Sequence, residues 1–145
     1  MNTITNKKLH HEYAVLEKYS VGIELFGSEV KSIKSGKVNL IGSKIILRGG
    51  EMYAIGIDVQ SYQENNLVGQ KEKYDKLRTR KLLMNRKEIG KIYKIMEDKH
   101  MHLMPYSIYE SHRLIKLDIA VCKKLNKHDK REKIKERDLD QSLYK

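Results

Sequence analysis

Two adjacent glycines, Gly49 and Gly50, impose the strongest local constraint on how this chain can fold. They separate two apolar runs, Lys44–Arg48 and Glu51–Ile57, which contain the isoleucines and the tyrosine that favour strands. A two-residue hairpin turn requires positive φ at its central positions, and glycine adopts positive φ without strain. The pattern therefore predicts a tight β-hairpin at this point of the chain.

Alternating apolar residues predict further strands before this hairpin. The runs Tyr13–Tyr19 and Val21–Leu25 have period two with a break between them, which indicates two strands. The next segment predicts a short helix that begins at Ser28, whose hydroxyl can cap a first-turn amide, and ends at Gly36.

The second half of the chain predicts one longer helix and two more strands. Asn85 is suited to cap a helix over Arg86–Lys99, where apolar residues recur at helical spacing. Two strands follow, Met101–Tyr109 and Arg113–Lys123, separated by a short turn. The only proline, Pro105, indicates that the first of these is an edge strand or contains a bulge.

Two segments carry no clear pattern of buried structure. Residues 60–77 are polar and aperiodic, which predicts a long loop. After Lys123 the chain is highly charged and its apolar residues are too sparse for a core. We expect this tail to be disordered alone and able to fold on a partner.

These elements predict a mainly β fold in a single domain. About six short strands with two or three flanking helices are typical of a closed antiparallel barrel of the oligonucleotide-binding type. We therefore assign residues 1–123 to the barrel domain and residues 124–145 to a basic C-terminal tail.

The charge balance indicates a polyanionic partner. The chain has 30 lysines and arginines against 19 acidic residues, a formal charge of +11, so nucleic acid is the leading partner. The weaker alternative is that the lysines only keep the protein soluble. Cys122 is the only cysteine, which indicates a reducing compartment. Since no signal peptide or membrane-spanning run is present, we expect a cytoplasmic protein without a membrane partner.

The sequence contains no recognisable catalytic motif. It lacks a nucleophile motif, a phosphate-binding loop and a dinucleotide fingerprint. His100 and His102 could share one face of a strand, but they have no third ligand at suitable spacing. We expect a binding protein, not an enzyme, without a cofactor or a metal ion.

Two basic clusters are candidates for contact with RNA. Arg78, Arg80 and Lys81 lie at the exit of the long loop and could bind phosphates, although an ordinary solvated charge run is equally compatible with local composition. Because they lie outside any apolar stripe, we expect that the two arginines can be removed without unfolding the domain. In the tail, His128 among its basic neighbours could stack on a base, and a nonspecific basic tail is the alternative.

Three motifs occur together in one order along the chain. They are Gly27–Ser32, Arg78–Leu83 and His128–Arg131, and together they resemble the SsrA-binding protein (small protein B) family over about residues 6–137. The resemblance implies a protein that binds the tRNA-like domain of transfer-messenger RNA and delivers this RNA to stalled ribosomes. It also implies that the tail enters the empty mRNA channel and becomes helical there.

The resemblance assigns roles to individual residues and partners. The residues implied at the RNA surface, facing or supporting it, are Asn39, Arg78, Arg80, Lys81, Leu83 and Lys116. The residues implied in ribosome binding are His128, Asp129, Lys130 and Arg131. The implied partners are transfer-messenger RNA, the decoding centre and mRNA channel of the ribosome, and elongation factor Tu indirectly through the charged RNA, with no DNA. The alternative is a generic ribosomal or single-strand RNA-binding barrel.

Overall fold

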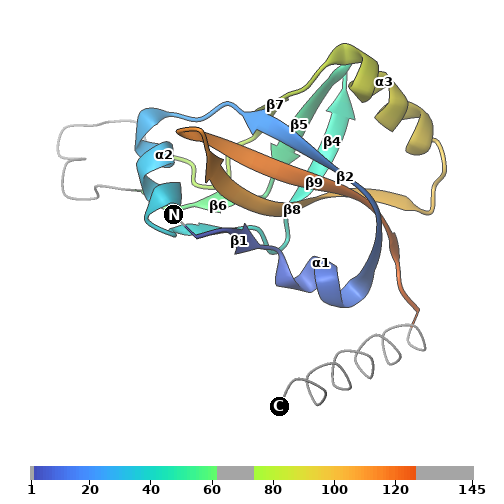
Figure 1. Ribbon diagram of the computed structural model, residues 1–145, viewed down its shortest axis with the longest axis horizontal. Coiled ribbons are helices and arrows are strands. Elements are labelled where there is room, and N and C mark those ends of the chain that lie inside the picture. Colours follow the sequence, from blue (N-terminus) through green and yellow to red (C-terminus); the bar gives the residue numbers. More distant parts are fainter. Residues whose placement is uncertain (1, 62–73, 127–145) are drawn as a thin grey trace.

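A computed structural model describes residues 2–61 and 74–126, and their fold is mainly β with three short helices (Figure 1). The elements in chain order are β1 (Ile4–Thr5), α1 (Lys7–Glu12), β2 (Tyr13–Ile23), α2 (Gly27–Lys34), β3 (Val38–Asn39), β4 (Lys44–Arg48), β5 (Glu51–Ile55), β6 (Asp58–Val59), β7 (Arg80–Leu83), α3 (Arg86–Ile95), β8 (Met101–Ser111) and β9 (Leu114–Lys124). Seven strands form one antiparallel sheet in the order β1-β8-β9-β2-β7-β5-β4, and β3 pairs with β6 separately. No helix among the described residues has the length and apolar character needed to cross a membrane.

The N-terminal part of the sheet is one long strand, so the prediction of two strands is wrong. Ser20, at the predicted break, pairs with Asp118 of β9 in regular register. The irregularity lies earlier, between Val15 and Glu17, where the register with β9 shifts. A bulge of this kind lets a long strand bend without interrupting its pairing.

The predicted β4–β5 hairpin is confirmed. Arg48 pairs with Glu51, and the two intervening glycines have φ of 59° and 78°. The β8–β9 hairpin is longer than predicted, because its turn consists of His112 and Arg113, which both have positive φ. Of the two alternatives predicted from Pro105, an edge strand or a bulge, the structure shows the bulge, since the pairing of β8 with β9 shifts register between Pro105 and Ser107.

The helices agree with the predictions except at their ends. Asn85 caps α3 by accepting a hydrogen bond from the Lys87 amide at 2.8 Å, but the helix ends at Ile95 rather than four residues later. Gly36, with φ of 80°, follows α2 as predicted. The predicted cap at Ser28 is wrong, because α2 already begins at Gly27. The sequence analysis missed α1, which is capped by the side chain of Asn6.

The core lies under one face of the sheet, but the predicted closed barrel is not found among the described strands. The fully buried side chains include Ile33, Met52, Leu82, Ile92 and Leu117, which come from helices and strands alike. The edge strands are β1 and β4. β4 lies against β8 without a strand ladder between them. Two features of β8 oppose closure: β1 occupies its edge near Ile108, and Pro105 has no amide hydrogen to donate.

Candidate nucleic-acid interface

One row of residues crosses four strands on the face of the sheet that points away from the core. Tyr109 of β8 is opposite Lys116 of β9, Lys116 is opposite Gly22 of β2, and Gly22 is opposite Leu83 of β7. The chain neighbours Ile108, Ile115, Val21 and Leu82 are buried, so these four residues point outward. The sheet thus places Leu83 and Lys116, two predicted site residues, on either side of a glycine. We call these four residues the cross-strand row.

Gly22 allows the row to be closely packed. A Cβ atom at this position would lie 3.2 Å from Cβ of Leu83, which is closer than ordinary van der Waals contact, and 3.4 Å from its Cδ1. The side chain of Leu83 is 49% exposed and lies against the glycine. The sequence analysis missed Gly22, although an isolated glycine inside a strand pattern is a known signal for close approach.

Lys81 extends this face along β7. It lies two residues before Leu83 and therefore points to the same side of the strand. Its Nζ atom is 3.9 Å from a carboxylate oxygen of Glu51, and the side chain is 38% exposed. A surface ion pair of this length contributes little, so the ammonium group remains available to a phosphate.

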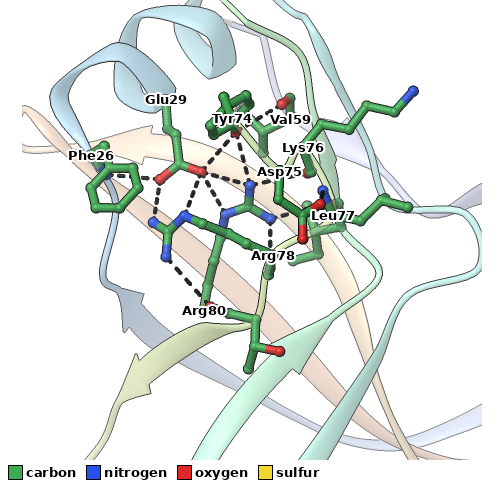
Figure 2. Close-up of polar contacts among 11 residues, drawn as sticks. Phe26, Glu29, Val59, Tyr74, Asp75, Lys76, Leu77, Arg78 and Arg80 are labelled. Carbon is green, nitrogen blue, oxygen red and sulfur yellow. Dashed lines mark hydrogen bonds and ion pairs between the residues drawn. The ribbon is translucent and has the colours of Figure 1, made fainter. Parts of the chain in front are cut away.

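Arg78 and Arg80 both bind the buried carboxylate of Glu29 on α2, but they differ in how deeply they are buried (Figure 2). Arg80 has 0% exposure; its Nε and Nη2 atoms donate to Glu29 Oε2 at 2.9 and 2.6 Å, and Nη1 donates to the Ile57 carbonyl at 2.8 Å. Arg78 bridges both carboxylate oxygens, with Nε donating to Oε2 at 3.1 Å and Nη2 donating to Oε1, and its side chain stays 23% exposed. Arg80 therefore lies beneath the surface, and only Arg78 of this pair keeps exposed side-chain surface.

Two aromatic residues complete this cluster (Figure 2). The hydroxyl of Tyr74 donates to Glu29 Oε2 at 2.9 Å and accepts from Arg80 Nη2 at 3.0 Å. The guanidinium carbon of Arg78 lies 3.9 Å from the ring centroid of Phe26, a cation–π contact. The Phe26 amide donates to Glu29 Oε1 at 2.8 Å. The sequence analysis missed both aromatic residues, which approach the arginines only in the folded chain.

Glu29 remains ionised at neutral pH despite its burial. Burial alone would raise its pKa, but hydrogen bonds from Arg78, the Phe26 amide, Arg80 and Tyr74 outweigh this effect and lower the pKa to about 2. The cluster therefore holds one negative and two positive charges. One excess positive charge remains, and Arg78 is the member through which it reaches the surface.

The remaining predicted residues lie apart from the cross-strand row. Asn39 is exposed on β3, where it pairs with Asp58 of the separate two-stranded sheet. Its Oδ1 atom accepts a hydrogen bond from the Ile41 amide at 2.9 Å, so its side chain shapes the following turn. The tail residues His128, Asp129, Lys130 and Arg131 lie outside the described residues, as does most of the predicted long loop.

Comparisons with known proteins agree on one family. A family model described as SmpB protein matches residues 3–145. The SsrA-binding protein of Clostridium acetobutylicum is 39% identical over 138 residues, which cover 94% of this chain and 86% of that protein. The SsrA-binding protein of Thermoanaerobacter pseudethanolicus is 40% identical over 140 residues, covering 97% of this chain and 87% of that protein.

A solved structure is similar over nearly the same length. It is described as "tmRNA-SmpB: a journey to the center of the bacterial ribosome", and its matching chain is 30% identical with a TM-score of 0.70. The match covers 91% of this chain and 94% of that chain.

Proposed function

This chain belongs to the SmpB protein family, and from that premise we propose which of its surfaces perform the family's function. It binds transfer-messenger RNA and acts with it in ribosome rescue, as a binding protein and not as an enzyme. The observation that carries this conclusion is the family match over nearly the whole chain. Since its partners are transfer-messenger RNA and the ribosome, it works in the cytoplasm.

We propose that the RNA lies across the cross-strand row. Lys116, Lys81 and the exposed part of Arg78 would contact phosphates, while Leu83 would contact a sugar or a base. The common outward direction of Lys116, Leu83 and Lys81 supports this assignment. Arg80 would act by holding Glu29 and, through it, Arg78. Asn39 would be a separate, accessory contact, supported by its exposure on β3.

We propose that residues 1–123 form the RNA-binding domain and that residues 124–145 act on the ribosome. The tail would enter the empty mRNA channel, with His128, Asp129, Lys130 and Arg131 close to ribosomal RNA near the decoding centre. The change to a highly charged sequence after β9 supports a separate role for this segment. Elongation factor Tu would meet the protein only through the charged transfer-messenger RNA.

We also propose that the sheet is a variant of the oligonucleotide-binding barrel. The support is the long, curved course of β2, β8 and β9 together with the position of β4 against β8 (Figure 1). A barrel with one gap in its hydrogen bonding still presents a continuous outer face on the strands that carry the cross-strand row.

A competition experiment tests the proposed function. The full-length protein is bound to labelled transfer-messenger RNA, and unlabelled bulk tRNA or unlabelled transfer-messenger RNA is added. We expect bulk tRNA to compete far less well, because the protein recognises more than phosphate charge. Equal competition by the two RNAs would instead favour a generic RNA-binding barrel.

A further inference from the structure

An ordered carboxylate lies beside the cross-strand row on the same face. Asp118 is two residues from Lys116 on β9 and is directly opposite Ser20 of β2 and Ser107 of β8. Its Oδ1 atom accepts a hydrogen bond from the Tyr109 hydroxyl at 2.9 Å, and its Oδ2 atom accepts from the Ser107 hydroxyl at 3.3 Å. Two hydroxyl donors of β8 therefore hold this side chain of β9 in one orientation.

The hydroxyl of Tyr109 links Asp118 to Ser20. Because the single proton of Tyr109 is donated to Asp118, its oxygen accepts from the Ser20 hydroxyl, which lies 2.8 Å away. The hydrogen bond from Ser20 favours the ionised tyrosine, but burial and the Asp118 carboxylate outweigh it and raise the pKa of Tyr109. Tyr109 is therefore a reliable donor at neutral pH, and each oxygen of Asp118 keeps a lone pair for another donor.

The charge of Asp118 opposes simple phosphate binding. Among residues 2–61 and 74–126, no lysine, arginine or histidine forms an ion pair with this carboxylate within 4.0 Å. An unpaired negative charge next to Lys116 repels RNA phosphates. A carboxylate can, however, accept hydrogen bonds from the amino and imino groups of RNA bases, which phosphates do not possess.

We propose that Asp118 is a specificity residue that accepts hydrogen bonds from the amino and imino groups of an RNA base lying across the sheet. Guanine fits best, because its N1–H and N2–H groups are adjacent donors that match the two carboxylate oxygens. Tyr109 and Ser20 are positioning residues that act through Asp118. This inference rests on the proposed function, since it takes the outer face of β8, β9 and β2 as the RNA surface.

The substitution Asp118→Asn tests this inference through the sign of its effect. If Asp118 only repels phosphates, removal of its charge strengthens binding of every RNA. If it recognises a base, the same change weakens binding of a transfer-messenger RNA transcript by about tenfold or more. Binding of bulk tRNA should stay the same or become slightly tighter. Asp98→Asn is the matched control, because it removes an exposed carboxylate on the turn after α3 and should not weaken either affinity.

Tyr109→Phe provides a second, independent measurement. It keeps the charge of Asp118 but removes the hydroxyl that orients it, so we expect a loss of several-fold for transfer-messenger RNA alone. Unchanged or tighter binding of transfer-messenger RNA by Asp118→Asn or by Tyr109→Phe would overturn the inference, and so would an equal loss for both RNAs. Thermal unfolding of each variant shows whether the fold is kept. If the wild-type protein fails to prefer transfer-messenger RNA, the proposed function fails instead.

Discussion

The buried carboxylate of Glu29 shows how one residue can decide the roles of two neighbouring arginines. Both Arg78 and Arg80 donate to it, yet only Arg78 retains exposed surface. A buried charge is tolerated when it is paired and hydrogen-bonded, and removal of one partner leaves the other charge uncompensated. The premise that both arginines lie outside the buried part of the domain is therefore wrong for Arg80, and we expect its removal to cost stability.

The two arginines should separate in a stability measurement. We expect Arg80→Ala to lower the free energy of unfolding by about 3–5 kcal/mol, because it leaves Glu29 buried with a weaker partner. Arg78→Ala should cost less, about 1–2 kcal/mol, and should lower RNA affinity in a protein that still folds. Urea unfolding of both variants gives the comparison. Equal losses of stability would contradict the different burial of the two side chains.

The ionisation of Glu29 predicts an acid-dependent loss of stability. Because folding lowers its pKa from 4.5 to about 2, its ionised form stabilises the fold above pH 4.5, and this contribution is lost as the pH falls toward 2. The contribution is about 3 kcal/mol at neutral pH. Urea midpoints measured between pH 7 and pH 2 test this. Glu29→Gln should be less stable at pH 7 and should show a shallower decline below pH 4.5, whereas parallel curves would exclude Glu29 as the cause.

At the scale of elements, the β4–β5 hairpin links the sheet to α3. The Gly50 amide donates to the hydroxyl of Tyr93 at 3.1 Å, so the turn is held by its own backbone and by the helix. Positive φ at Gly49 and Gly50 makes both positions unfavourable for a residue with a side chain.

A matched pair of glycine substitutions tests the turn. Gly50→Ala should lower the free energy of unfolding by about 1–2 kcal/mol, because alanine is strained at φ of 78°. Gly27→Ala is the control: Gly27 begins α2, has open space where a Cβ would lie and does not have positive φ, so alanine should be neutral or stabilising by up to about 1 kcal/mol. Thermal unfolding of both variants measures the two effects. If both melting temperatures fall by a similar amount, the result contradicts a specific requirement for glycine in the turn.

At the scale of the whole molecule, the charge of +11 predicts strongly salt-dependent RNA binding. If about six phosphates are neutralised, the logarithm of the affinity should fall against the logarithm of the salt concentration with a slope of roughly −4 to −5. Lys116→Ala and Lys81→Ala should each make this slope less steep by about 1. Titrations at several salt concentrations measure it, and a slope near zero would exclude phosphate contacts as the main source of affinity.

Truncation should separate RNA binding from ribosome rescue. β9 extends to Lys124, and the Leu125 amide donates to the Glu12 carbonyl at 2.8 Å, so a cut after Asn126 leaves the described contacts of the sheet in place. We expect the truncated protein to bind transfer-messenger RNA nearly normally and to lose peptide tagging in a reconstituted translation system. Full-length His128→Ala should bind normally and tag more slowly, because base stacking is worth about 1–3 kcal/mol. Undiminished tagging by the truncated protein would contradict a role for the tail.

The sequence alone determined the features that depend on neighbouring residues. The turn at Gly49 and Gly50, the cap at Asn85 and the bulge after Pro105 follow from the backbone preferences of single residues, and each is present. The family was also evident from short motifs that keep their order along the chain. Net charge, which needs no structure, indicated the class of partner.

Only the tertiary structure decided which distant residues meet and which side chains are buried. Leu83, Gly22 and Lys116 become neighbours through the pairing of β7, β2 and β9, whose register depends on contacts between strands far apart in the chain. Arg80 looked like its neighbour Arg78, but only Arg80 lies within β7, where it shares the buried side of the strand with Leu82 and Glu29 compensates its charge. The open edge between β4 and β8 likewise depends in part on a distant pairing, because β1 occupies the edge of β8 near Ile108.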